Sequence, residues 1–246
     1  MNNRLNNQVA IVTGAGSGLG AATARALAGA GCAVACVDIN AAPIEQLCGE
    51  LQARDSKCMA HTCDVSDADA VFGAVETVAA RFDRLDIVVN CAAIDHTLGV
   101  DDLTVEQWDR VLGINLRGPF LFAKAAMPIM RRQRRGQIVN IASTAATRAW
   151  ANASAYHASK WGLVGLSRAL GVEGRPDNIR VTTIIPGGMR THFFDRFAAQ
   201  GIPIPDERNL QDPATVAETI VFALCLPEQS VMQEVLITPL TESSWP

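Results

Sequence analysis

Long apolar runs are absent from the sequence. Glycines and Arg25 interrupt the stretch from Val9 to Val37, so no uncharged run reaches the roughly 18 residues that a membrane span requires. The first residues, Met1–Asn7, are polar and lack the apolar segment of a secretory signal. We therefore expect a soluble, cytoplasmic protein.

An excess of positive charge is also absent. The formal net charge is -4 and the sequence pI is about 5.6, which excludes a global positive field for nucleic acid or an anionic membrane. The expected partners are small molecules and copies of the chain itself. The basic residues Arg131, Arg132, Arg134 and Arg135 are interpreted as a solvated helix end. A phosphate-binding role for this cluster is the alternative.

Cysteine pairs with metal-binding spacing are missing. The chain has 7 cysteines, an odd count, and none forms a CxxC pair. Several lie in apolar runs such as Val34–Val37, where cysteine acts as a small core residue. These features favour a reducing cytoplasm, and no metal site is predicted.

The 246 residues, 49% of them hydrophobic, suit one domain over residues 1–246. Short apolar runs that read as strands alternate with longer segments of helical period, an order typical of a doubly wound α/β sheet with helices on both faces. We predict a parallel sheet of about seven strands. The predicted strands are Val9–Thr13, Ala33–Asp38, Lys57–Thr62, Asp86–Asn90, Gln137–Ala142 and Arg180–Ile185. The predicted helices are Leu19–Ala30, Ile44–Arg54, Ala68–Phe82, Val105–Met130 and Ala155–Glu173.

Ligands of such a sheet gather beyond the carboxyl ends of its strands. A stretch from 187 to 212 breaks the alternating pattern and is rich in glycine, proline and phenylalanine. A long loop in a compact domain is usually functional, so we interpret it as a substrate lid. A surface excursion with one amphipathic helix is the alternative.

A glycine-rich turn follows the first predicted strand and leads directly into a helix. Glycine allows the backbone to turn tightly and to approach a pyrophosphate, whose charge the helix N-terminus attracts. The spacing does not match G-x-G-x-x-G, and a lone glycine motif is weak evidence. The predicted dinucleotide-binding residues here are Gly14, Ser17, Gly18, Leu19 and Gly20.

Asp38 ends the second predicted strand, twenty residues after Gly18. A carboxylate there can accept hydrogen bonds from the adenosine ribose and would repel the 2′-phosphate of NADP. Ser17 and the stretch Ile39–Ala42 contain no Arg or Lys to neutralise that phosphate. The sequence therefore favours NAD over NADP. Asp38 as the N-cap of the next helix is the alternative.

Tyr156 and Lys160 stand four residues apart in a predicted helix, so their side chains share one face. A free tyrosine has a pKa near ~10, so a phenolate at pH 7 needs roughly 4 kcal/mol of preferential stabilisation. Lys160 and a cationic oxidised nicotinamide are the expected sources. A tyrosine and a lysine at this spacing often occur by chance, so a catalytic role depends on the other motifs of the sequence.

In that context the chain resembles the short-chain dehydrogenase/reductase family from Val9 to about Pro239. The glycine turn, Asp38, Ser143 and the Tyr156–Lys160 pair match in order and spacing. The resemblance implies a Rossmann-type fold, with Tyr156 as general acid/base and Lys160 lowering its pKa and binding the nicotinamide ribose. It implies that Ser143 holds the substrate oxygen and that Asn115 anchors a water of a proton relay. A mid-helix asparagine without function is the alternative for Asn115.

The resemblance also assigns further cofactor contacts. Asp64 and Val65 would frame the adenine, Asn90 would lie beside the adenosine ribose, and Thr191 in the Pro186–Thr191 motif would hold the nicotinamide carboxamide. With Tyr156 and Lys160, the remaining residues expected to bind NAD are Ile39, Ala92, Pro186 and Gly187.

Two features depart from the family pattern. Asn90-Cys91-Ala92-Ala93 replaces the usual Asn-Asn-Ala-Gly, which places a methyl group where glycine lets the backbone approach the cofactor. The usual Val-Asp-Gly-Gly ending is missing, which weakens the case for a carried-over tetramer. The long predicted helices resemble those that pair between subunits of the family, so a homodimer or homotetramer is expected.

The predicted reaction is hydride transfer between NAD(H) and a secondary alcohol or ketone, without a metal. The alternatives are a 3-oxoacyl-thioester reductase and a non-catalytic dinucleotide sensor. Candidates for the substrate pocket are Ile94, Asp95, His96, Ala145, Ala149, Trp150, Met189, His192 and Phe193.

Overall fold

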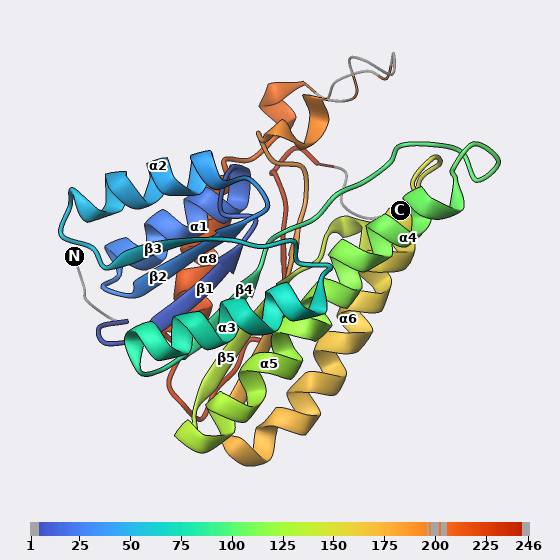
Figure 1. Cartoon of the computed structure of the whole chain (residues 1–246). Coiled ribbons are helices and arrows are strands. Elements are labelled where there is room, and N and C mark those ends of the chain that lie inside the picture. The colour runs from blue at the N-terminus through green and yellow to red at the C-terminus, as the bar shows by residue number, and fades with distance from the viewer. Residues whose placement is uncertain (1–4, 196, 198–201, 203–205, 243–246) are drawn as a thin grey trace.

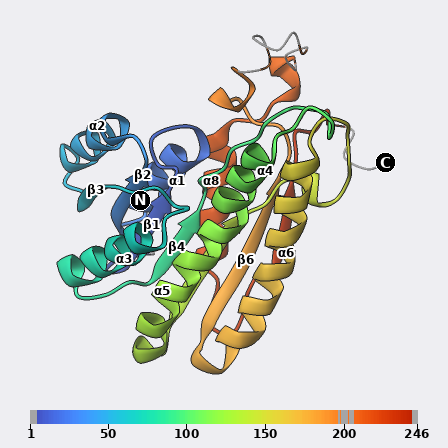
Figure 2. The same ribbon diagram turned by 45° about the vertical axis from the view of Figure 1, so that its right-hand side comes forward.

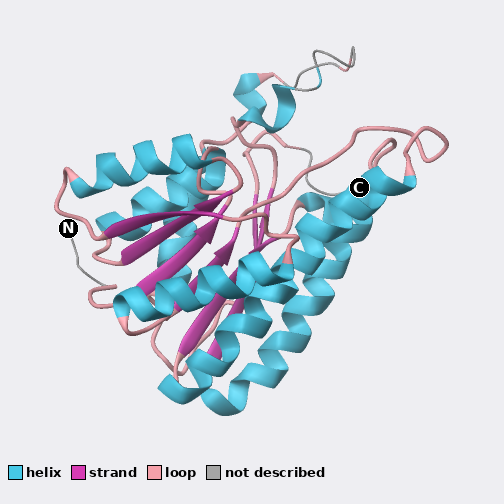
Figure 3. Ribbon diagram, viewed as in Figure 1, coloured by secondary structure: helices cyan, strands magenta, loops and turns pink. Residues whose placement is uncertain are grey.

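The computed structural model describes residues 5–195, 197, 202 and 206–242. Seven parallel strands form one sheet in the order β3-β2-β1-β4-β5-β6-β7 (Figures 1 and 3). The strand order reverses between β1 and β4, which creates a crevice at their carboxyl ends. The predicted parallel α/β sheet is confirmed. The strands are β1 (Val9–Thr13), β2 (Ala33–Asp38), β3 (Cys58–Thr62), β4 (Ile87–Asn90), β5 (Gly136–Ile141), β6 (Ile179–Pro186) and β7 (Glu234–Ile237).

Helices cover both faces of the sheet (Figures 1 and 2). One face carries α1 (Gly18–Gly29), α2 (Ala41–Gln52) and α8 (Pro213–Leu224). The other carries α3 (Ala68–Phe82), α5 (Gly118–Gln133) and α6 (Ser154–Gly174), with α4 (Val105–Leu112) at the end of α5. The described helices include none that is both long and apolar enough to cross a membrane.

Two apolar clusters fill the spaces between the sheet and its helices. Along β1, Val12 belongs to the cluster beneath α1, and its neighbour Ile11 belongs to the cluster beneath α3 and α5. Successive side chains of a strand point to opposite faces, so a strand buried on both faces is apolar throughout. This is why the short apolar runs of the sequence predicted the strands well.

The helix predicted over Val105–Met130 is wrong in its middle. A π-helical segment, Gly113–Arg117, separates α4 from α5. Such a segment inserts one extra residue into a helical turn and is common at functional sites. Apolar periodicity continues across the insertion, so no sequence pattern predicted it.

Two elements lay outside the sequence predictions. Helix α8 begins at Pro213, after Asp212 caps it by accepting from the Ala214 N–H at 2.8 Å. This Asp-Pro pair is a helix start signal that was interpreted as the end of the loop. Strand β7 has four residues whose burial alternates between exposed and intermediate, a pattern too short to recognise.

Three arginines of the basic cluster at the C-terminal end of α5 form ion pairs with acidic residues. Arg131 and Arg134 pair with Asp177 at 3.3 and 2.7 Å, and Arg135 pairs with Glu228 at 3.4 Å. The three arginine side chains are 45%, 66% and 44% exposed, as expected of a solvated helix end.

The cysteine prediction needs a correction. Cys48 of α2 and Cys58 of β3 form a disulfide, whereas the reducing cytoplasm that we expected implies free thiols. Ten residues separate the two cysteines, and only the fold brings their sulfurs together.

Candidate active site

A cavity of about 930 Å³ lies beyond the carboxyl ends of β1, β4, β5 and β6. Of the predicted cofactor residues, all except Asn90 line it. Of the predicted catalytic residues, all except Asn115 line it. The predicted residues on its wall are Gly14, Ser17, Gly18, Leu19, Gly20, Asp38, Ile39, Asp64, Val65, Ala92, Ser143, Tyr156, Lys160, Pro186, Gly187 and Thr191.

The glycine turn leaves one wall of this cavity without side chains. Gly14 has a φ of +64°, and a Cβ there would lie 2.9 Å from the backbone of Ala92. A Cβ on Gly20 would lie 2.0 Å from the Gly14 carbonyl oxygen. Helix α1 begins in this turn, so its first N–H groups and its dipole face the cavity. A pyrophosphate group fits such a cradle.

Asp38 connects the glycine turn to the start of α2. Its Oδ2 accepts from the Gly16 N–H at 3.0 Å, and its Oδ1 accepts from the Asn40 N–H at 3.0 Å. Asn40, rather than Asp38, occupies the N-cap position of α2, so the capping alternative is wrong. The carboxylate lines the cavity beside the glycine turn and makes this end electronegative.

Asp64 lies on the same side of the cavity, after β3. Its Oδ1 accepts from the Ser66 N–H and hydroxyl at 2.9 and 2.7 Å, and its Oδ2 pairs with Arg110 at 2.9 Å. Partial burial raises the pKa of Asp64, but these hydrogen bonds and the Arg110 charge outweigh it, so the pKa is lowered. The carboxylate is therefore ionised and fixed against α4.

Asn90 points into the core. It is 3% exposed and its Nδ2 donates to the Asn140 Oδ1 at 2.8 Å, while Asn140 donates to the Ser167 hydroxyl at 2.8 Å. Its side chain thus ties β4, β5 and α6 together. The place of Asn90 beside the adenosine ribose stays a prediction.

Asn115 occupies the π-helical segment and is 1% exposed. Its Oδ1 accepts from the Ile94 N–H at 2.9 Å, and its Nδ2 donates to the Ile94 carbonyl at 2.8 Å and to the Ser159 hydroxyl at 3.1 Å. This amide fixes the loop after β4, which lines the cavity, to helix α6.

Tyr156 and Lys160 project from the first turns of α6. Lys160 is 2% exposed, and its Nζ donates to the Ile141 carbonyl at 2.8 Å and lies 5.5 Å from the centroid of the Tyr156 ring. Burial lowers the pKa of Lys160 to about 8, although a negative charge on Cys91 would oppose this. An ammonium therefore stands beside the phenol ring at neutral pH.

Ser143 follows β5 and caps a short 3₁₀ turn, accepting from the Ala145 N–H at 3.1 Å. The next loop is held by His157, one residue after Tyr156. The Trp150 N–H donates to His157 Nε2 at 3.1 Å, so the ring proton is assigned to Nδ1, which donates to the Ala145 carbonyl at 2.8 Å. Ser143 and Tyr156 are thereby fixed on the same wall.

The loop after β6 contacts the C-terminal segment. The Gly188 N–H donates to Glu242 Oε2 at 2.9 Å, and Glu242 also forms a short ion pair with Arg148. Thr191 lies against the glycine turn, where a Cβ on Gly18 would be 3.2 Å from its Cγ2. The Pro186–Thr191 motif is thus placed between the glycine turn and the Tyr156 wall.

The ends of the predicted lid are tied to each other. Arg190 donates its N–H to the Gln211 carbonyl, and Gln211 donates to the Gly188 carbonyl, each at 3.0 Å. Residues 196, 198–201 and 203–205 of this segment lie outside the described residues. The lid stays a prediction.

Most of the candidate substrate contacts line the cavity. Those on the wall are Ile94, Asp95, Trp150, Met189, His192 and Phe193, whereas His96, Ala145 and Ala149 are not among the lining residues. The Phe193 ring lies 5.5 Å from the Tyr156 ring, centroid to centroid.

Sequence reasoning missed four residues that shape the site. Thr13 accepts from the N–H groups of Cys91 and Ala92, each at 3.1 Å, and so fixes the loop after β4. His157, Arg148 and Glu242 were also missed. The His157 position next to Tyr156 was a possible signal, but the Arg148–Glu242 pair spans 94 residues of sequence and had none.

The sequence and the fold are similar to those of known proteins. A D-threitol dehydrogenase of Mycolicibacterium smegmatis is 44% identical over 183 residues, which cover 74% of this chain and 70% of that protein. A cyclohexanol dehydrogenase of an Acinetobacter species is 32% identical over 226 residues, covering 91% of this chain and 90% of that protein. The crystal structure of a metagenomic short-chain oxidoreductase in complex with NADP aligns with a TM-score of 0.85 at 30% identity, covering 97% of this chain and 100% of that one.

Residues 8–200 match the family described as short chain dehydrogenase. This match includes the glycine turn, Ser143 and the Tyr156–Lys160 pair. A side-chain-free cradle at a helix N-terminus and a buried lysine beside a tyrosine are compatible with the nicotinamide dinucleotide that this family binds. The chain therefore belongs to the short-chain dehydrogenase family of oxidoreductases.

Proposed function

We propose that the protein is an NAD-dependent dehydrogenase that interconverts a secondary alcohol and its ketone. The observation that carries this proposal is the buried ammonium of Lys160, 5.5 Å from the Tyr156 ring, on a cavity that Ser143 also lines. The NAD site would comprise the predicted cofactor residues on the cavity wall, with Asn90, buried at the end of β4, beside the adenosine ribose.

Tyr156 would take the hydroxyl proton during alcohol oxidation and return it during ketone reduction. Lys160 would stabilise the phenolate by its charge, and Ser143 would hold the substrate oxygen by a hydrogen bond. When bound, the nicotinamide supplies the hydride chemistry at its C4. Asn115 would hold the loop at Ile94 in a fixed position against helix α6. This would keep the catalytic side chains of α6 correctly placed beside the substrate.

We propose NAD rather than NADP because of the negative charge at the end of the cavity where the adenosine would bind. Asp38 supplies a carboxylate there, and Ile39 beside it is 54% exposed and apolar. Arg25 lies near the glycine turn but pairs with Glu50 at 2.8 Å, so its charge is compensated. The metagenomic structure holds NADP, so cofactor choice in this chain rests on its own residues at this end.

Asp38→Asn tests this cofactor choice, because it removes the charge and keeps the side-chain shape. We expect the wild type to favour NAD over NADP by about 100-fold in kcat/KM, which corresponds to about 2.7 kcal/mol. The variant should lose most of this preference, and Asp38→Asn with Ile39→Arg should reverse it. A wild type that prefers NADPH would refute the argument.

The substrate class is best sought among small polyols first. The 44% identical relative is a D-threitol dehydrogenase, and polar groups of Asp95, Thr97, Arg148 and Glu242 line the cavity together with Trp150. A panel of polyols, cyclic alcohols, hydroxy acids and 3-hydroxyacyl thioesters, with NADH formation followed by absorbance, tests the proposal. No alcohol-dependent reduction of NAD with any of them would contradict it.

A further inference from the structure

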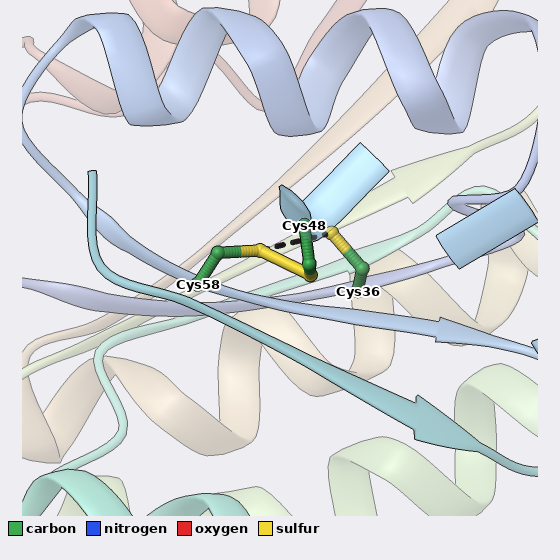
Figure 4. Close-up of side chains that lie close together, drawn as sticks. All are labelled: Cys36, Cys48 and Cys58. Atoms are coloured by element: carbon green, nitrogen blue, oxygen red, sulfur yellow. Dashed lines mark hydrogen bonds between the residues drawn. A yellow bond between two sulfur atoms is a disulfide. The ribbon is translucent and has the colours of Figure 1, made fainter. Parts of the chain in front are cut away.

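Three cysteine sulfurs from three elements lie close together at the packing of α2 on β2 and β3 (Figure 4). Cys36 belongs to β2, Cys48 to α2 and Cys58 to β3. Their sulfurs lie within 4.8 Å of one another. Cys48 and Cys58 form a disulfide, and the Cys36 sulfur lies 3.7 Å from the Cys58 sulfur. Disulfide sulfurs carry no proton, so Cys36 is the hydrogen-bond donor of that pair.

Burial favours a neutral cluster over a metal site. Cys36 and Cys48 are 0% and 5% exposed and belong to the apolar cluster under α1 and α2. Desolvation raises the pKa of the Cys36 thiol to about 12, so it is protonated at neutral pH. Three thiolates around a cation would place negative charge in this apolar region, and zinc normally takes a fourth ligand. Among the described residues, the group of possible ligands contains only the three sulfurs.

Cys58 is the cysteine of this cluster that would react first with an oxidant. It is half-buried, and β3 is the edge strand of the sheet, paired only with β2 among the described strands. Thiolate character and exposure determine which cysteine reacts first with an oxidant, and a second cysteine nearby allows a disulfide to form. Cys58 has both the more open position and a partner thiol in contact.

We propose that Cys48 and Cys58 form a reversible redox site that reacts with hydroperoxides and clamps α2 to β3. The Cys58 thiolate attacks a peroxide oxygen, which breaks the O–O bond and gives a sulfenic acid and an alcohol or water. The Cys48 sulfur then displaces the sulfenic hydroxyl, which leaves as water and closes the S–S bond. Two thiols lose two electrons and two protons, and the peroxide gains them. A dithiol reverses the step by exchange.

The clamp acts on the helix beside the adenosine end of the cavity. Helix α2 begins three residues after Asp38, and its Pro43 lies against the glycine turn, where a Cβ on Gly16 would be 3.3 Å from the Pro43 Cβ. Apolar residues Ile44, Leu47 and Leu51 hold α2 to the sheet in either redox state. Reduction therefore loosens α2 without unfolding it, and the loss of preorganisation weakens cofactor binding.

Thiol counting and peptide mapping test the bond. Untreated protein unfolded without reductant should show five reactive thiols, and seven after reduction. Cleavage after Arg54 and Lys57 separates Cys48 from Cys58, and cleavage after Glu45 separates Cys48 from Cys36. Peptides containing Cys48 and Cys58 should stay linked until reduced, and treating reduced protein with one equivalent of hydrogen peroxide should restore the link. Seven thiols after peroxide treatment would overturn the proposal, as would one equivalent of bound metal that Cys48→Ala removes.

Thermal unfolding tests the clamp. Oxidised wild type should melt roughly 5 °C above the reduced protein, because the bond restricts the unfolded chain. The Cys48→Ala/Cys58→Ala variant should show no difference between the two conditions, whereas Cys225→Ala should behave as wild type. Equal melting temperatures for oxidised and reduced wild type would contradict the clamp.

Calorimetry tests whether the disulfide affects cofactor binding in the cavity. The Kd for NADH should rise on the order of threefold when wild type is reduced and should not respond in the double variant. An unchanged Kd in wild type would remove the coupling between this site and the cavity. The thiol count and the melting temperature do not depend on turnover, so their failure is distinct from a failure of the proposed dehydrogenase activity.

Discussion

At the scale of the residue, Tyr156 offers a direct measurement because it is the only tyrosine in the chain. Its phenolate absorbance in the ultraviolet can be titrated without interference from another phenol. Burial holds the pKa of Lys160 at about 8, so the ammonium is present below pH 8 and is lost as the pH rises through that value. The ammonium can stabilise the phenolate only while it is charged, so we predict a Tyr156 midpoint at or below about 8, against the ordinary value of ~10.

Lys160→Met is the matched variant for this titration, since it keeps the length of the side chain and removes its charge. The Tyr156 midpoint should move upward by about 1 to 3 pH units relative to wild type. Identical midpoints in the two proteins would show that Lys160 does not stabilise the phenolate.

Sequence patterns identified some residues of the candidate site and missed others. Tyr156 and Lys160 lie in one helix, and Asp38 directly ends a strand. Such local relations can be identified from the sequence because they depend on a single element of secondary structure. The hydrogen bond from Asn90 to Asn140 on the neighbouring strand joins residues 50 apart in the sequence, and no local pattern predicted it. Glu242 reaches the loop after β6 from 54 residues away, which no local pattern encodes.

At the scale of the element, the π-helical segment gives Asn115 its position. Asn115→Ala would leave the Ile94 N–H and carbonyl without their side-chain partner and the Ser159 hydroxyl without a donor. We expect the free energy of unfolding to fall by about 2 kcal/mol. The catalytic rate should fall at least tenfold, because the Ile94 loop lines the cavity.

Chemical denaturation and steady-state kinetics check this prediction, with the exposed Asn6→Ala as the control. A variant that loses stability but keeps the wild-type rate would show that the segment serves packing alone.

Sequence patterns predict regular strands and helices better than they predict insertions or contacts between elements. Strands buried on both faces and amphipathic helices carry period-2 and period-3.6 signals, and these positioned most of the sheet and its helices. The insertion at Gly113–Arg117 left the apolar period intact. The disulfide between α2 and β3 depends on how these elements pack, and the spacing of its cysteines gave no hint of it.

At the scale of the whole molecule, apolar side chains remain exposed on the helices that resemble the family's subunit contacts. Phe120 of α5 and Trp161 of α6 are 46% and 55% exposed. We propose a homodimer or larger homo-oligomer through these helices. Light scattering should give at least twice the 26.2 kDa chain mass, and Trp161→Glu should shift it toward monomer. Monomer mass for the wild type would refute this.

We propose that Tyr156 carries the proton in the reaction of an NAD-dependent alcohol dehydrogenase. The most direct test is turnover by Tyr156→Phe on the best alcohol of the panel, with NADH binding measured alongside. We predict nearly unchanged NADH affinity and a fall in kcat on the order of 10³-fold, because the ring stays and the proton carrier is lost. Wild-type turnover in Tyr156→Phe would contradict the account.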